Sequence, residues 1–280
     1  HLDEVAKRAL AADLTEEKRL VKVGGQYALM GYRVYPTFTM LVHGYDPGEV
    51  PPDWTRYAYV DPVHRVAAVL FCAVPPPSSG DFVLVYDELY LTGCDAEAFA
   101  HAMAQRAIGQ QFEAFLIDLH MAIHTEIGVG KNVLQQYSEA LSKHKVASVT
   151  TGSGFLFASD NVMAGILAVQ GMLRVRPESN TPRLQVMRER CSNLEHEFRL
   201  YHRRRVAGEV RNEPDSRRKT HLMDCLRYMA LHEPKYVPHR APKEPEPWAL
   251  RRLREKAESA RKREGPDTFV NLGPGGGKPW

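Results

Sequence analysis

Cysteine is scarce in this sequence, and no two cysteines lie close together. The chain of 280 residues has four, at positions 72, 94, 191 and 225, without a C-x-x-C pair. Structural zinc sites need paired cysteines, and small disulfide-stabilised domains need several at short spacings. The sequence therefore indicates neither class, and a protein of the reducing cytosol is expected.

Long apolar runs are missing as well. No stretch approaches the roughly 20 residues that span a bilayer, and the N-terminus lacks the apolar core of a signal peptide, so no membrane partner is expected. The segment Gly128-Val129-Gly130-Lys131-Asn132 lacks the first glycine and the final Ser or Thr of a phosphate-binding loop. We interpret it as a loop before a helix. The chain begins with His rather than Met, which predicts a piece of a longer protein.

Positive charge is concentrated in two parts of the chain. Residues 234–280 hold 11 Lys and Arg against 6 Asp and Glu, whereas residues 1–233 hold 26 against 28. Within the latter part, residues 199–219 carry 8 basic and 3 acidic side chains. Such clustering is typical of a polyanion-binding protein. Prolines at 234, 238, 242, 245 and 247 predict a linker, followed by a basic helical tail.

The order of apolar patterns predicts an α/β domain with a mixed five-stranded sheet flanked by helices. Aromatic and β-branched runs predict the strands, and apolar residues three or four apart predict the helices. A polar lead-in occupies residues 1–53, the domain residues 54–233, and the linker and tail residues 234–280. The expected strands are 56–62, 65–74, 81–91, 112–118 and 145–150, with a short extended piece at 182–186. The expected helices begin at 95, 132, 159, 191 and 218.

Acidic residues stand where two of these strands end. Asp61 closes the first strand and Asp118 the fourth, and a divalent ion can be shared by two acids if those strands are neighbours, because adjacent strands lie roughly 5 Å apart. His221 and Asp224 are three residues apart and so share one face of the last helix. Hard cations prefer carboxylate and water oxygens. These residues are therefore candidate ligands, although Asp61 is followed by proline and also fits a turn.

Each of the other candidates has an alternative structural role. Asp118 also fits a cap in a strand-to-helix loop, and Asp224 also fits an exposed helix acid paired with Arg227. His221 also fits a histidine of the surface or core. Glu88, in the third strand, also fits a charge on an edge strand. Acids at two strand ends and on one late helix together favour the metal site.

Several segments, taken in order, resemble one protein family. The order of elements and acids is similar to that of the ribonuclease H-like fold. The sequence around the acids resembles the nuclease domain of tailed-phage terminase large subunits, the DNA-packaging motors. The resemblance covers about residues 30–232, and the order of its segments along the chain is more specific than any single motif. The segments are Gly31-Tyr32-Arg33-Val34-Tyr35-Pro36-Thr37-Phe38, Val85-Tyr86-Asp87-Glu88-Leu89-Tyr90, Asn161-Val162-Met163-Ala164-Gly165-Ile166, Cys191-Ser192-Asn193-Leu194-Glu195-His196-Glu197-Phe198 and His221-Leu222-Met223-Asp224-Cys225-Leu226-Arg227-Tyr228.

The resemblance implies particular roles for the acidic residues. Asp61, Asp118 and Asp224 would be the catalytic metal ligands, His221 a fourth ligand, and Glu88 an accessory ligand. Two Mg²⁺ or Mn²⁺ ions would be the cofactors. The sequence departs from the family pattern after the first two acids, where Pro62-Val63-His64 and Leu119-His120 replace Pro-Gly and Pro-Ala, and at Thr220, where the family has Asp.

The resemblance also implies a function and its partners. The chain would be an endonuclease that cuts concatemeric double-stranded viral DNA during packaging, in the cytoplasm of the infected bacterial host and transiently at the procapsid portal. An ATPase domain would lie upstream, and the portal and the small terminase subunit would be further partners. Phosphates would be gripped without base readout by Arg203, Arg204, Arg205, Arg211, Arg217, Arg218 and Lys219. The alternative for this basic run is a solvated loop.

Two other functions remain open from the sequence. One is a Holliday-junction resolvase or transposase-like nuclease of the same superfamily, which would prefer four-way junctions to linear duplex. The other is a non-catalytic packaging module that binds DNA without metal.

Overall fold

A mixed sheet of seven strands forms the centre of the described structure. The computed structural model describes residues 33–238 except 64–65, 124–129, 207–208, 216 and 218–219. The strand order is β1-β9-β4-β3-β2-β5-β6. Residues 1–32 of the expected lead-in and the expected basic helical tail lie outside the described residues. The predicted domain limits at residues 53 and 233 stay predictions.

Three long strands form an antiparallel meander, as the sequence predicts. They are β2 (Thr55–Val63), β3 (Val66–Val74) and β4 (Val83–Thr92). Strand β5 (Phe112–Asp118) pairs in parallel with β2, and β6 (Leu156–Ala158) in parallel with β5. Strand β3 is apolar throughout and buried over most of its length, since both faces of the sheet are covered.

Two further strands extend the sheet at the β4 edge. Strand β9 (Leu184–Met187) pairs in parallel with β4, and β1 (Gly44–Tyr45) pairs in parallel with β9. The extended piece expected at 182–186 thus overlaps β9, which comes last in chain order among the strands of the sheet. The α/β class with a mixed sheet flanked by helices is confirmed, and the number of strands in the sheet is seven rather than five.

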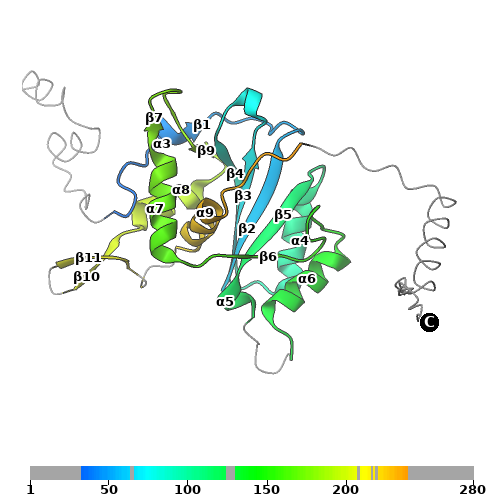
Figure 1. The fold of residues 1–280 in the computed structure, drawn as a ribbon. Coiled ribbons are helices and arrows are strands. Elements are labelled where there is room, and N and C mark those ends of the chain that lie inside the picture. The colour runs from blue at the N-terminus through cyan, green and yellow to red at the C-terminus, as the bar shows by residue number, and fades with distance from the viewer. Residues whose placement is uncertain are drawn as a thin grey trace, which may run out of the picture. The chain divides into compact units, whose positions relative to one another are not determined.

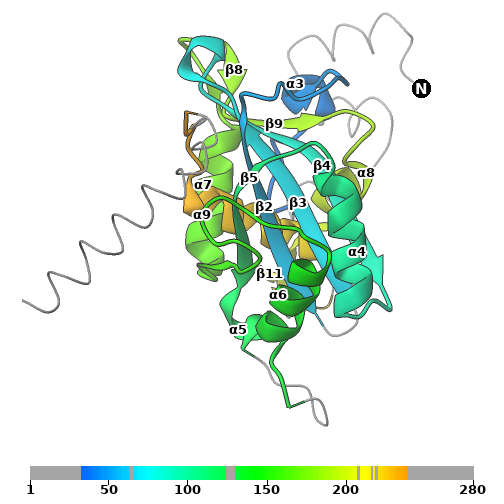
Figure 2. The same cartoon turned by 90° about the vertical axis from the view of Figure 1, so that its right-hand side faces the viewer.

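Two groups of helices cover opposite faces of the sheet (Figures 1 and 2). Helices α7 (Val162–Leu173), α8 (Ser192–Leu200) and α9 (His221–His232) lie on one face. Helices α4 (Ala96–Ala107) and α6 (Val133–Lys143) lie on the other. The remaining short elements are α3 (Met40–His43), η2 (Pro77–Ser79), α5 (Leu119–Ala122), β7 (Val175–Arg176) and β8 (Thr181–Pro182).

The alternation of side chains divides each central strand between two cores. Tyr57 and Tyr59 of β2 pack in the core that includes α9, whereas Ala58 and Val60 pack in the core that includes α4. Because successive side chains of a strand point to opposite faces, the next odd-numbered residue of β2 faces α9. On β5 the even-numbered residues, such as Leu116, face α9.

Three predicted elements are wrong in place or type. Residues 145–150 form turns rather than a strand, since Lys145 has a left-handed backbone (φ 57°) after α6 and the loop closes through a hydrogen bond from the Ser148 amide to the Gly152 carbonyl. Helix α7 is capped by the Asn161 side chain, which accepts from the Ala164 amide, not by residues 159–160. Helix α9 begins at His221 rather than at 218.

The predicted basic loop is also wrong, because it forms a hairpin. Strands β10 (Arg203–Val206) and β11 (Glu209–Pro214) pair antiparallel between α8 and α9. In Figure 1 this hairpin projects from the side of the molecule on which α7 lies. Both strands carry charged side chains that face solvent, so the hydrophobic pattern of the sequence does not indicate this hairpin.

Helix α8 is capped by a residue from another element. Its own N-cap residue, Cys191, makes no side-chain capping bond. Instead Glu88 of β4 accepts hydrogen bonds from the backbone amides of Asn193 (2.7 Å, Oε1) and Leu194 (2.9 Å, Oε2). A carboxylate at this place satisfies free amides and interacts favourably with the positive end of the helix dipole.

We expect Glu88→Ala to lower the free energy of unfolding by about 1–3 kcal/mol, because it leaves two backbone amides of the first turn of α8, one of them buried, without an acceptor. Glu88→Gln keeps one acceptor oxygen and should lose less. Urea unfolding followed by circular dichroism measures both, with Glu178→Ala, at an exposed acid, as control. Equal stability of Glu88→Ala and wild type would contradict the capping role.

Candidate metal centre

Two of the predicted acids lie side by side near the ends of neighbouring parallel strands. Asp118 is the last residue of β5, as predicted, whereas β2 continues two residues past Asp61 to Val63. Val60 of β2 is in register with Ile117 of β5, and Asp61 and Asp118 are the residues that follow this pair. By the alternation described above, both side chains point to the face covered by α9. Asp61 and Asp118 are buried, with 3% and 5% of their surface exposed.

Helix α9 brings the other two candidates to the same place. Cys225 in its second turn donates from Sγ to the carbonyl of Ala68 (3.5 Å), and Ala68 is paired with Asp61 across β3 and β2. His221 Nδ1 donates to Asp61 Oδ2 at 2.9 Å. Asp61, His221 and Asp224 each offer a ligand atom, and these atoms all lie within 4.8 Å of one another.

Asp118 stands beside this group rather than within it. Its ligand atoms are not among those within 4.8 Å, but its charge raises the pKa of both Asp61 and Asp224. The structure thus brings three of the four predicted ligands to one point and places the fourth close enough to act on them electrostatically. Their roles as ligands stay predictions.

The electrostatics of the group suit a divalent cation. Burial raises the pKa of Asp61 to about 6, while its hydrogen bond with His221 opposes the rise. Burial also raises the pKa of Asp224, and Arg227 opposes it. The hydrogen bond to Asp61 raises the pKa of His221. Carboxylates that resist ionisation because they are buried together are stabilised in their charged form by a nearby positive ion.

The donor atoms also fit such an ion. Carboxylate oxygens suit Mg²⁺ and Mn²⁺. The Nε2 atom of His221 is buried and has no hydrogen-bond partner in the described part of the chain. A buried imidazole nitrogen without a partner is rare and is available to a cation or its water. The residues present therefore fit the predicted cofactor.

Glu197 is a site residue that the sequence reasoning missed. Its carboxylate is buried and accepts a hydrogen bond at Oε2 from the backbone amide of Met223 (2.9 Å), in the first turn of α9. Burial raises the pKa of Glu197 to about 8, and His221 and Asp224 act on it electrostatically. Glu197 lies on the apolar stripe of α8 with Leu194, Phe198 and Tyr201. An acid on such a stripe is expected to be buried, and this pattern could have identified Glu197 from the sequence.

Glu88 and several of the described basic residues have other partners in the structure. The accessory-ligand role of Glu88 stays a prediction, and both of its oxygens already accept amides of α8. Arg203 donates to the carbonyl of Asn212, Arg211 pairs with Glu209, and Arg217 pairs with Asp215. Arg204 is exposed on β10. Arg218 and Lys219, and the side chain of Arg205, are outside the described residues.

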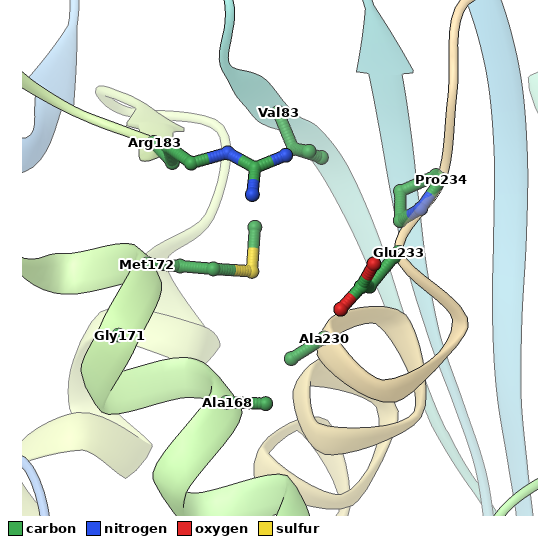
Figure 3. Close-up of a pocket in the computed structure, with 8 residues that line it drawn as sticks. All are labelled: Val83, Ala168, Gly171, Met172, Arg183, Ala230, Glu233 and Pro234. Atoms are coloured by element: carbon green, nitrogen blue, oxygen red, sulfur yellow. The ribbon is translucent and has the colours of Figure 1, made fainter.

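A cavity of about 290 Å³ lies at the other end of α9 (Figure 3). Arg183 and Glu233 point into it over a floor that includes Met172. Since α9 rises about 1.5 Å per residue, this cavity is roughly 18 Å from His221 along the helix. It is therefore not part of the acidic centre. Its lining is Val83, Ala168, Gly171, Met172, Arg183, Ala230, Glu233 and Pro234.

Comparison with solved structures identifies the fold. The chain is similar to the large terminase of a thermophilic bacteriophage in complex with ADP, with a TM-score of 0.53 and 14% sequence identity over 82% of this chain and 52% of that one. It is also similar to the nuclease domain of the P22 large terminase, with a TM-score of 0.50 and 16% identity over 72% and 92% of the two chains. No protein-family model and no curated protein matches the sequence.

The class that this fold defines is the ribonuclease H-like α/β fold. More specifically, it is the fold of a terminase nuclease domain, and the resemblance found in the sequence is confirmed at that level. The chain spans about half the length of the thermophilic phage terminase that it matches.

We expect Asp61→Asn to raise the stability of the metal-free protein by about 1–3 kcal/mol at pH 7.5, because it removes a buried charge whose pKa is about 6. Thermal unfolding in EDTA measures this change. Asp53→Asn, at an exposed acid, is the control. A lower melting temperature for Asp61→Asn than for wild type would contradict this expectation. It would show that neighbouring groups already compensate the buried charge of Asp61.

Glu197→Gln should flatten the dependence of stability on pH. In the folded protein Glu197 keeps its proton up to about pH 8, whereas in the unfolded chain it loses the proton near pH 4.3. The free energy of unfolding therefore falls as pH rises between these values. We expect the variant to lose about 3 kcal/mol less than wild type between pH 5 and pH 8.5. Urea titrations in EDTA at both pH values test this, and parallel losses would contradict it.

Proposed function

We propose that this chain is the metal-dependent nuclease domain of a terminase large subunit and that it hydrolyses phosphodiester bonds of concatemeric double-stranded DNA. The observation that carries the proposal is the convergence of Asp61, His221 and Asp224, with ligand atoms within 4.8 Å of one another, on a terminase nuclease fold. Asp118 completes the acidic group beside them.

The residues of the site have separate tasks in this proposal. Asp61, Asp118 and Asp224 hold Mg²⁺ or Mn²⁺, and His221 orients Asp61 through its Nδ1 hydrogen bond. Glu197 fixes the first turn of α9, on which His221 and Asp224 stand. When bound, two divalent ions would supply an activated water and stabilise the leaving oxygen.

The partners follow from the same proposal. The hairpin of β10 and β11 would contact DNA phosphates through its arginines, in a sequence-independent and salt-sensitive way. The terminase of the thermophilic phage was solved with ADP, and we propose that an ATPase domain precedes this domain in the whole protein. The portal and the small terminase subunit would be further partners in the host cytoplasm. No helix in the described part is long and apolar enough to cross a membrane.

We expect Asp61→Ala and Asp118→Asn each to lower Mn²⁺-dependent nicking of a supercoiled plasmid by about a hundredfold or more, because each removes a ligand or its neighbour from the cation site. The gel assay is run with and without EDTA, and circular dichroism checks the fold of each variant. Asp53→Asn should cleave like wild type.

The outcomes separate the competing functions. Loss of nicking in both folded variants supports the proposal, and full activity of either overturns the assignment of its acid. A wild-type chain that binds DNA but shows neither cleavage nor a Mn²⁺-dependent thermal shift would be a non-catalytic module. Strong preference for four-way junctions over linear duplex would indicate a resolvase.

A further inference from the structure

Arg227 is a buried charge one turn after Asp224 on α9. Only 6% of its surface is exposed. Its Nη2 atom pairs with Oδ1 of Asp224. Burial alone would lower the pKa of Arg227, and the charge of Asp224, together with its hydrogen bond and the nearby tyrosines, reverses this effect. Burying a guanidinium is unfavourable unless it is well paired, so the pair with Asp224 is central to its stability.

The aliphatic part of Arg227 lies against α7 at Gly165. A Cβ atom on Gly165 would come within 2.9 Å of Arg227 Cβ, 3.2 Å of its Cγ and 3.3 Å of its Cδ. The glycine thus leaves the space that the arginine side chain fills. The first three side-chain carbons of Arg227 therefore pass close to the backbone of α7 at Gly165.

Two tyrosines lie close enough to the other end of the side chain to interact with the guanidinium electrostatically. Tyr35 and Tyr201 stack with ring centroids 5.6 Å apart. Burial raises the pKa of Tyr201 to about 12, and Arg227 opposes the rise. The Nε atom of Arg227 is buried and has no hydrogen-bond partner in the described part, whereas its Nη2 atom is hydrogen-bonded to Asp224.

We propose that Arg227 is a positioning residue for the cation site, which holds Oδ1 of Asp224 so that the other carboxylate oxygen is presented to the metal. This inference rests on the proposed function. Outer partners of ligating carboxylates fix their orientation, and their loss commonly costs 10–100-fold in metal affinity or activity. Gly165 takes part indirectly, because it makes room for the Arg227 side chain.

The direct test measures Mn²⁺ affinity, with free Mn²⁺ followed by electron paramagnetic resonance. Arg227→Met keeps the apolar length and removes the charge, and we expect its dissociation constant to rise by about 10-fold or more. Arg227→Lys keeps a cation that can reach Asp224 and should stay within about threefold of wild type. Nicking at saturating Mn²⁺ is measured alongside.

A second test leaves the charged residues in place. Gly165→Ala pushes against the Arg227 side chain, and we expect it to weaken Mn²⁺ binding in the same direction as Arg227→Met. Gly171→Ala is the matched control on the same helix, because a Cβ there meets no atom within 4 Å. It should bind Mn²⁺ like wild type, which separates the effect of displacing Arg227 from a general effect of alanine in α7.

The possible results are distinct. Weaker binding by folded Arg227→Met or by Gly165→Ala, with Arg227→Lys and Gly171→Ala near wild type, supports the positioning role. Unchanged affinity in both Arg227→Met and Gly165→Ala overturns it, and so does tighter binding by Arg227→Met, which would show that the guanidinium competes with the cation. A wild-type protein that binds no Mn²⁺ would refute the proposed function itself.

Discussion

The hydrogen bond between His221 and Asp61 joins the two halves of the site, and the arrangement of the acids depends on it. One partner lies near the end of a central strand and the other begins the last described helix, 160 positions later in the chain. Burial makes the negative charge on Asp61 unfavourable, and the imidazole is the first group to compensate it. The sheet, the helix and the electrostatics of the site therefore meet in a single contact.

Helix α9 serves the site as a rigid support held at several points. Glu197 binds its first turn through the Met223 amide, Cys225 contacts the carbonyl of Ala68, and Arg227 packs on Gly165 of α7. Since His221 and Asp224 lie within the same turn, these contacts restrict both side chains together. Separate elements thus fix the position of acids that repel one another.

The sequence predicted the parts of this arrangement that depend on local patterns. The strands that carry Asp61 and Asp118, the Asp95 cap of α4 and the apolar face of α9 follow from β-branched runs and helical spacing. It could not predict Glu197 as a site residue or the cap that Glu88 supplies to α8, because these depend on contacts between elements distant in sequence. The hairpin was missed because its charged residues carry no apolar period, and β6 because turn residues separate it from α6.

The pairing of β2 with β5 also limits how this protein can change during evolution. Both acids face α9 only because each stands a fixed number of residues from the Val60 and Ile117 pair. Insertion or deletion of one residue inside either strand would turn its acid toward the α4 side of the sheet, into an apolar core. The connection between α6 and β6 carries no acid of the group, so a change in its length would leave the register of Asp61 and Asp118 intact.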